Sequence, residues 1–143
     1  MKALVVPFLR ILDNWATQRI VRVAVFGQGL GLTEWDSLST SAYSKTIPQI
    51  KCVIDPSEAH VMAIHGPITL LSWPMLEAWV QKARFDARFI AIGAEIEINR
   101  EGHIIGPRGE LSSFKVQGIL PGHPPAPQEI IAAVKTVMEM PRV

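Results

Sequence analysis

Short runs of apolar and β-branched residues alternate with helix-like stretches from Val21 onward, and this alternation constrains the fold more than any other feature. Five runs predict strands, at 21–26, 50–54, 60–65, 88–92 and 114–120. A capping-box spacing over Thr33-Glu34-Trp35-Asp36 predicts a helix opening there. Apolar residues at helical spacing predict helices over 71–83 and from about residue 128 onward, while 97–109 is expected to form a glycine-rich loop. Strands alternating with helices are typical of βαβ units. We therefore expect an α/β domain with a mainly parallel sheet of four to five strands.

The first 20 residues differ from the rest of the chain. Phe8, Leu9, Ile11, Leu12 and Trp15 recur at helical spacing with polar residues between them, which predicts an amphipathic N-terminal helix. The apolar stretch is too short to span a bilayer. We expect residues 1–20 to be an arm and 21–143 to be one domain, as the length of 143 residues allows. The arm either packs on its own domain or docks on a partner or on a membrane surface.

Charge and cysteine content narrow the partners and the compartment. The formal net charge is +1 and no run of basic residues is present, so nucleic acid is not an expected partner. Cys52 is the single cysteine. It excludes an internal disulfide and a CxxC metal site, and it fits a reducing compartment such as the cytoplasm.

A glycine-containing loop, Gly27-Gln28-Gly29-Leu30-Gly31, follows the first predicted strand and precedes a predicted helix. Backbone amides in that position suit anions. The dinucleotide pattern GxGxxG would need glycine at 32, where the chain has Leu32, and no GKS or GKT follows. A free-standing nucleotide- or flavin-binding domain that uses the 27–31 loop is therefore an alternative function. No GxSxG motif is present, and we predict no catalytic residues.

Three motifs in register carry a resemblance to a known family. They are His60–Pro67 followed by Pro74-Met75-Leu76, then Arg88–Ala94, and then Pro121-Gly122-His123-Pro124-Pro125-Ala126-Pro127. From about Val23 to Met138 the chain resembles the quinone-proximal iron–sulfur subunit of respiratory complex I and the small subunit of membrane-bound [NiFe] hydrogenases. The resemblance implies a flavodoxin-like three-layer domain whose loops hold a [4Fe–4S] cluster through four cysteines.

The chain departs from this family at every cluster ligand. Matching Gly27 and Glu34 to the family pattern puts its first cysteine pair on Leu30 and Gly31, or on Gln28 and Gly31 in the hydrogenase-like variant. The third and fourth cysteines fall on Glu95 and His123. None of these can supply a thiolate, so no cofactor is expected. Glu95 and His123 could be two ligands of zinc or iron, but no third ligand accompanies them, and we predict no metal site.

The resemblance implies a structural role. We expect a non-redox small subunit of a complex I-like or hydrogenase-related assembly, not catalytic alone, that forms an interface with the large subunit and membrane subunits. Its arm would contact the inner side of the membrane peripherally. Leu30, Glu95 and His123 should lie near one another at one edge of the sheet. The loop and interface positions are Gly27, Gly29, Glu34, Gly66, Pro67, Gly93, Pro121, Gly122 and Pro124.

Overall fold

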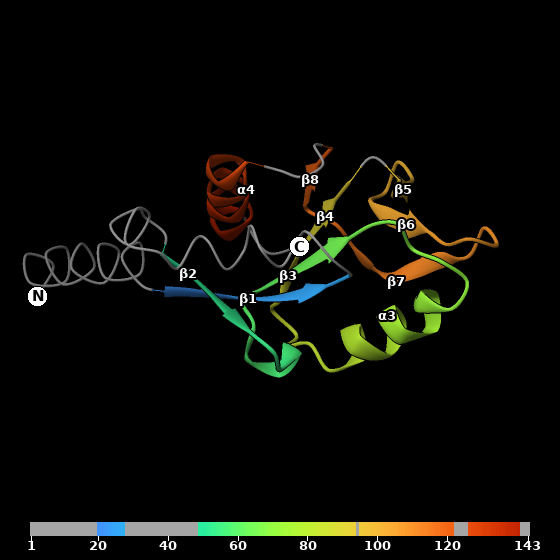
Figure 1. The fold of residues 1–143 in the computed structure, drawn as a ribbon, viewed down its shortest axis with the longest axis horizontal. Coiled ribbons are helices and arrows are strands. Elements are labelled where there is room, and N and C mark those ends of the chain that lie inside the picture. The colour runs from blue at the N-terminus through green and yellow to red at the C-terminus, as the bar shows by residue number, and fades with distance from the viewer. Residues whose placement is uncertain (1–19, 28–48, 94, 122–125, 141–143) are drawn as a thin grey trace, which may run out of the picture.

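The computed structural model describes residues 20–27, 49–93, 95–121 and 126–140 (Figure 1). The elements, in chain order, are β1 (Ile20–Phe26), β2 (Gln49–Val53), the 3₁₀ turn η1 (Pro56–Glu58), β3 (Val61–His65), α3 (Ser72–Gln81), β4 (Arg88–Ile92), β5 (Glu97–Ile98), β6 (His103–Ile105), β7 (Leu111–Lys115), β8 (Gly118–Leu120) and α4 (Pro127–Glu139). The predicted helix near Thr33 lies outside the described residues, as does the predicted arm except for Ile20, which begins β1.

The main sheet has five strands in the order β2-β1-β3-β4-β8, and every neighbouring pair is parallel. This confirms the predicted α/β class with a mainly parallel, flavodoxin-like sheet. Because β1 lies between β2 and β3, the strand order reverses beside β1. Open α/β sheets bind ligands at such a reversal, outside the carboxyl ends of the strands.

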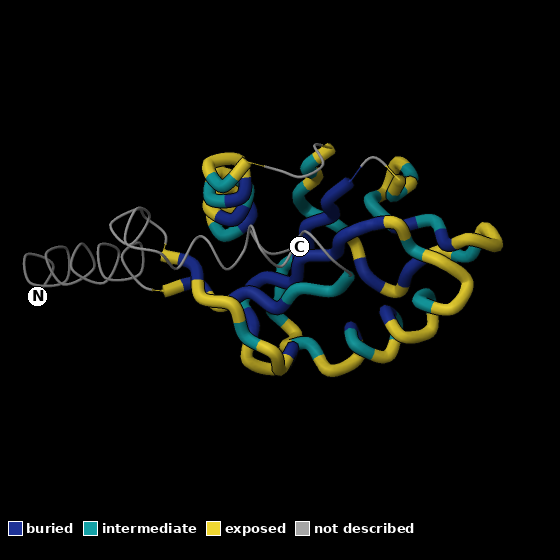
Figure 2. Tube along the Cα trace, viewed as in Figure 1, coloured by how far each residue is buried: buried dark blue, intermediate teal, exposed yellow. Residues whose placement is uncertain are grey.

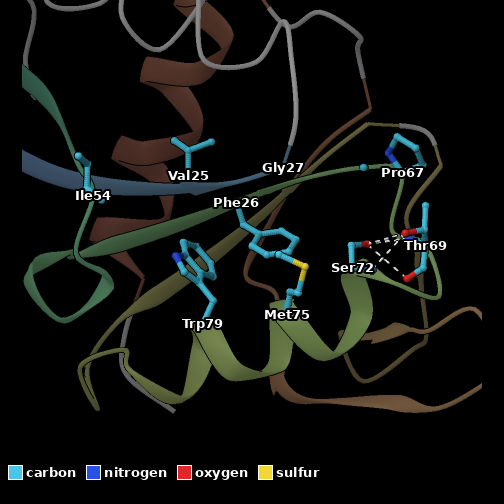
Figure 3. Close-up of a pocket in the computed structure, with 10 residues that line it drawn as sticks. Val25, Phe26, Gly27, Ile54, Pro67, Thr69, Ser72, Met75 and Trp79 are labelled. Carbon is cyan, nitrogen blue, oxygen red and sulfur yellow. Dashed lines mark hydrogen bonds between the residues drawn. The ribbon is translucent and has the colours of Figure 1, made fainter.

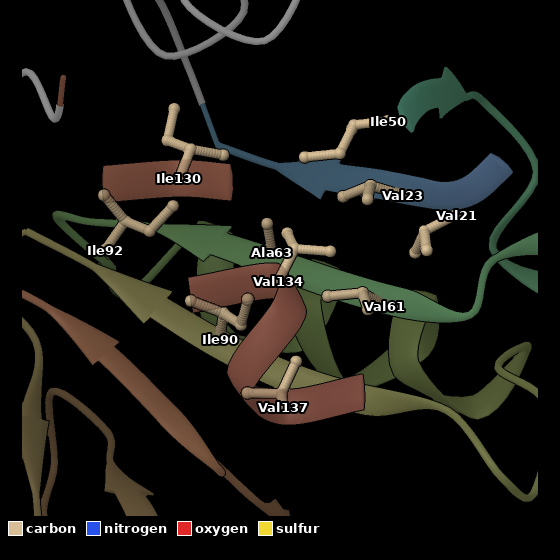
Figure 4. Close-up of a cluster of buried hydrophobic side chains, with 10 residues drawn as sticks. All are labelled: Val21, Val23, Ile50, Val61, Ala63, Ile90, Ile92, Ile130, Val134 and Val137. Atoms are coloured by element: carbon tan, nitrogen blue, oxygen red, sulfur yellow. The ribbon is translucent and has the colours of Figure 1, made fainter. Parts of the chain in front are cut away.

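Helix α4 covers one face of the sheet (Figure 4). Ile130, Val134 and Val137 follow one another at helical spacing, are fully buried, and belong to the same apolar cluster as Val23 and Ile90. Burial of side chains of this size stabilises the fold by roughly 1.5–3 kcal/mol each. The predicted inward face of the last helix is confirmed, with Ile131 and Met138 packed at the margin of the cluster.

Helix α3 covers the opposite face. Leu76 and Val80 are buried there, while Trp79 and Ala83 are partly buried against the same cluster, as the helical spacing predicts. Figure 2 shows the consequence, with buried strands between two helices whose outer turns are exposed. No helix among the described residues is both long and apolar enough to cross a membrane.

The region 97–109 is not the single loop that we predicted. It contains β5 and β6, which pair antiparallel and continue to β7 as a second, three-stranded sheet. Strands of two and three residues are too short for an alternating pattern to be detected in the sequence. The turn between β5 and β6 depends on Asn99, whose side chain accepts hydrogen bonds from the backbone N–H groups of Glu101 and His103. The small sheet adds Ile104 and Phe114 to the α3 side of the core.

The predicted strand 114–120 is in fact two strands. β7 ends at Lys115 and joins the small sheet, whereas β8 begins at Gly118 and joins the main sheet. Gln117 lies at the break, where its side chain accepts a hydrogen bond from the N–H of Phe89 at 2.7 Å and its own N–H donates to the Phe89 carbonyl at 2.9 Å. Phe114 stacks on Phe89 with ring centroids 4.5 Å apart. These contacts divide one apolar run between two sheets.

Candidate functional site

The five parallel strands of the main sheet end at one edge, and a predicted motif residue follows the ends of β1, β3, β4 and β8. The N–H of Gly66, after β3, donates to the carbonyl of Ile92 in β4 at 3.0 Å. The N–H of Gly93, after β4, donates to the carbonyl of Leu120 in β8 at 2.9 Å. The structure therefore brings together the described motif positions, which are Gly27, Gly66, Pro67, Gly93 and Pro121.

Gly27 follows the last residue of β1 and has a backbone conformation that suits only glycine. Its φ is +128°, and a Cβ added there would lie 2.7 Å from the Cβ of His65 and 2.9 Å from the His65 carbonyl oxygen. His65 is itself buried at the end of β3. The ends of β1 and β3 thus approach too closely for a side chain between them.

Glu95, where the sequence resemblance would put a third cysteine, follows Gly93 at the end of β4. A Cβ built on Gly93, whose φ is +112°, would lie 3.0 Å from the Oε2 atom of Glu95, and one built on Gly66 would lie 3.7 Å from its Cβ. The carboxylate therefore lies back over the sheet edge. Among the other predicted positions, Gly29, Leu30, Gly31, Glu34, Gly122, His123 and Pro124 lie outside the described residues. The expected proximity of Leu30, Glu95 and His123 stays a prediction.

The residues do not fit a cluster of the family type. A [4Fe–4S] cluster is held by thiolates, and Cys52 lies within β2, opposite Val23 of β1, rather than in a loop at the carboxyl edge. Within the described ranges, no group of three or more His, Cys, Asp or Glu side chains is placed to hold a metal ion. Glu95 alone is not a metal site.

A cavity of about 510 Å³ opens between α3 and the ends of β1 and β3 (Figure 3). It lies at the reversal of strand order described above. Phe26 from β1 and Trp79 from α3 form one wall, with ring centroids 5.4 Å apart and planes tilted by 48°. The described residues that line it are Val25, Phe26, Gly27, Ile54, Gly66, Pro67, Thr69, Ser72, Met75 and Trp79.

Thr69 and Ser72 bond to each other where α3 begins. The Thr69 N–H donates to the Ser72 Oγ at 2.7 Å, and the Ser72 N–H donates to the Thr69 Oγ1 at 3.1 Å. The two hydroxyls are also 3.2 Å apart. This reciprocal arrangement satisfies amides at the helix start, so the two polar side chains of the cavity wall are already engaged.

Exposed apolar side chains flank the cavity, with Ile54 at the end near Trp79 and Leu70 and Leu71 at the end where α3 begins (Figure 3). We define the edge patch as Ile54, Leu70, Leu71 and Met75, which are 98%, 55%, 85% and 64% exposed. Ile54 and Met75 line the cavity, and Leu70 and Leu71 immediately precede α3. Single exposed apolar residues are ordinary, whereas a group of them marks a surface that binds a partner or ligand.

Sequence reasoning did not identify the cavity. The helical spacing places Trp79 on the inward face of a helix, and Met75 belongs to one of the quoted motifs. A signal was nevertheless present, because Met75 and Trp79 are four residues apart on the helix that follows the third strand, and Phe26 ends the first. Combined with the reversal of strand order beside β1, this spacing would place Phe26, Met75 and Trp79 at one site.

No protein-family model matches the sequence. The chain is 34% identical over 86 residues to an uncharacterized protein of Methanocaldococcus jannaschii. This match covers 58% of the chain and 57% of the archaeal protein, so the chain spans little more than half the length of that relative.

Proposed function

We propose that the protein is a non-redox small subunit of a complex I-like or membrane-bound hydrogenase-related assembly, and that it serves as a structural interface to the large subunit. The proposal includes a cytoplasmic location, with peripheral contact between residues 1–20 and the inner side of the membrane. It assigns no catalytic residue to this chain. The catalytic chemistry would belong to the partner subunits.

The edge patch is the observation that carries this proposal. Leu71, at 85% exposed, and Ile54, at 98%, lie at the same edge of the sheet as the motif residues Gly66 and Gly93. In the family that the sequence resembles, this edge carries the cluster loops. An apolar surface here suits docking on another protein, because burying exposed apolar side chains is the main favourable contribution to association.

The non-redox part of the proposal follows from ligand chemistry. Cluster iron is held by thiolates, and the chain has one cysteine, which lies in β2. Glu95 replaces one ligand of the family pattern with a carboxylate. A domain of this kind can retain the packing of the small subunit without an electron carrier.

Affinity capture from the native membrane tests the proposal. The full-length tagged protein should co-purify with a large subunit and membrane subunits, identified by mass spectrometry. The double variant Leu71→Ser/Met75→Ser should reduce that capture strongly, because truncating well-placed apolar contacts can weaken an interface by 2 kcal/mol or more, as an order-of-magnitude guide.

Phe85→Ser is the matched control. Phe85 is 93% exposed and follows α3 near the start of β4, at the opposite end of the helix from the substituted Leu71. Its substitution removes a comparable apolar side chain and should leave capture unchanged. Equal loss in both variants, or capture of no oxidoreductase subunit by the unsubstituted protein, would count against the proposal.

The cavity favours the second candidate function, a free-standing domain that binds a small molecule. Its position at the reversal of strand order is the usual place for a ligand in such sheets. The capture experiment separates the two candidates, because a free-standing domain would bring down no membrane subunits.

A further inference from the structure

The cavity beside β1 and β3 has a wall of distinctive chemistry. None of its described lining residues is ionisable, and most are aromatic, aliphatic or glycine. We propose that this cavity is a binding site for an uncharged, planar aromatic molecule of two or three fused rings. The inference rests on the second candidate function, a domain that binds a small molecule, and names the class of ligand.

The cavity has the size and shape for such a ligand. Its volume of about 510 Å³ is within the range of roughly 300–1,000 Å³ typical of small-molecule sites. Figure 3 shows Trp79, Phe26 and Met75 side by side between α3 and the strand ends. A flat ring system can lie across this row and contact all three side chains.

The side chains favour an aromatic ligand over an aliphatic one. The rings of Phe26 and Trp79 offer offset or edge-to-face contacts to a third ring. Met75 adds a polarisable thioether, which contacts aromatic rings favourably, and at 64% exposed it remains accessible at the cavity mouth. Ile54, also at the mouth, would lose much of its exposed apolar surface when a ligand binds.

The charge pattern favours an uncharged molecule. A phosphate or carboxylate inside the cavity would meet no cationic side chain among the described lining residues. The hydroxyls of Thr69 and Ser72 are already bonded to each other and to backbone amides. Burying a charged group without a partner is costly. The ring, rather than an attached phosphate, is therefore the part that the cavity recognises.

Riboflavin and flavin mononucleotide form a matched pair of probes, because they differ only in the phosphate. Equilibrium dialysis of the full-length protein should show saturable riboflavin binding with a Kd on the order of 100 μM. Flavin mononucleotide should bind no more tightly. Trp79→Phe should weaken riboflavin binding by roughly three- to tenfold, and Met75→Ala by roughly threefold.

One further variant and a check on folding make the result decisive. Trp73→Phe, on the same helix but outside the cavity lining, should leave binding unchanged. If Trp79→Phe loses its cooperative unfolding transition, Met75→Ala decides alone, since its side chain is mostly exposed. Absence of saturable binding, or binding unaffected by Met75→Ala, would overturn the proposal. Binding of flavin mononucleotide more than tenfold tighter than riboflavin would also overturn it, because the phosphate would then carry recognition.

Discussion

Replacing Gly27 with alanine should strongly destabilise the protein, because β1 and β3 meet there. Two costs add. Holding a non-glycine residue at a φ of +128° costs about 1–2 kcal/mol, and forcing a methyl group to within 2.7 Å of the His65 Cβ costs about 1–3 kcal/mol. The contact is with buried backbone and a Cβ rather than a flexible side-chain end, so it cannot relax easily. We expect a loss of about 3 kcal/mol.

Gly109→Ala separates the two costs. Gly109 has a φ of +82°, and nothing lies within 4 Å of an added Cβ. It should therefore lose only the backbone part, about 1–2 kcal/mol. Urea unfolding followed by circular dichroism measures both, and with a denaturant slope near 2 kcal/mol/M the Gly27→Ala midpoint should fall by about 1.5 M. Equal losses in the two variants would refute close packing of the strand ends.

Three further substitutions test the core, a helix end and a loop. Ile90→Ala should lower the free energy of unfolding in urea by about 2–5 kcal/mol, because Ile90 is fully buried beneath α4. Ile119 is 58% exposed, so Ile119→Ala should change that free energy by no more than about 0.5 kcal/mol. Equal effects would contradict the packing of this face. Arg88→Ala should lower the free energy of unfolding by about 2 kcal/mol in the same assay, because the guanidinium donates hydrogen bonds to the Val137 and Met140 carbonyls at the end of α4. An unchanged urea midpoint would show that these bonds contribute nothing to stability. The Ser57 hydroxyl and backbone amide donate hydrogen bonds to the Asp55 carboxylate and lower the pKa of that carboxyl group. The ionised carboxylate therefore stabilises the fold at a pH above the ordinary Asp pKa near 3.9. That stabilisation is lost as the pH falls through the lowered pKa. The stability difference between Asp55→Asn and the unsubstituted protein, from thermal melts, should be constant near neutral pH and shrink below about pH 4; a difference independent of pH would contradict this.

The main sheet could be predicted because its strands are long apolar runs. β3 is buried at all five positions, and β4 at four of five, so both appear in the sequence as nearly continuous hydrophobic segments. The small sheet could not be predicted in the same way. Its shortest strand has two residues, and only Ile104 of β6 is fully buried. Its formation depends on tertiary contacts with α3, such as the hydrogen bond from Ser113 to Glu77.

The candidate site was predicted only in part. Gly27, Gly66 and Gly93 are recognisable because glycine after a strand marks a tight loop, and the structure brings these loops to one edge. The cavity depends on which strands are neighbours, since Phe26, Ile54 and Trp79 are far apart in sequence. Local patterns do not contain strand order, so these side chains could not be assigned to one wall.

Iron and sulfide analysis of the native protein decides whether the chain carries a cluster. The tagged full-length protein is isolated anaerobically from its own cells, and its iron, acid-labile sulfide and visible absorbance are measured per chain after separation from its partners. We expect no stoichiometric iron or sulfide and no broad visible absorbance, because Leu30, Gly31, Glu95 and His123 cannot supply thiolates. A stoichiometric iron–sulfur cluster on this chain would contradict this expectation.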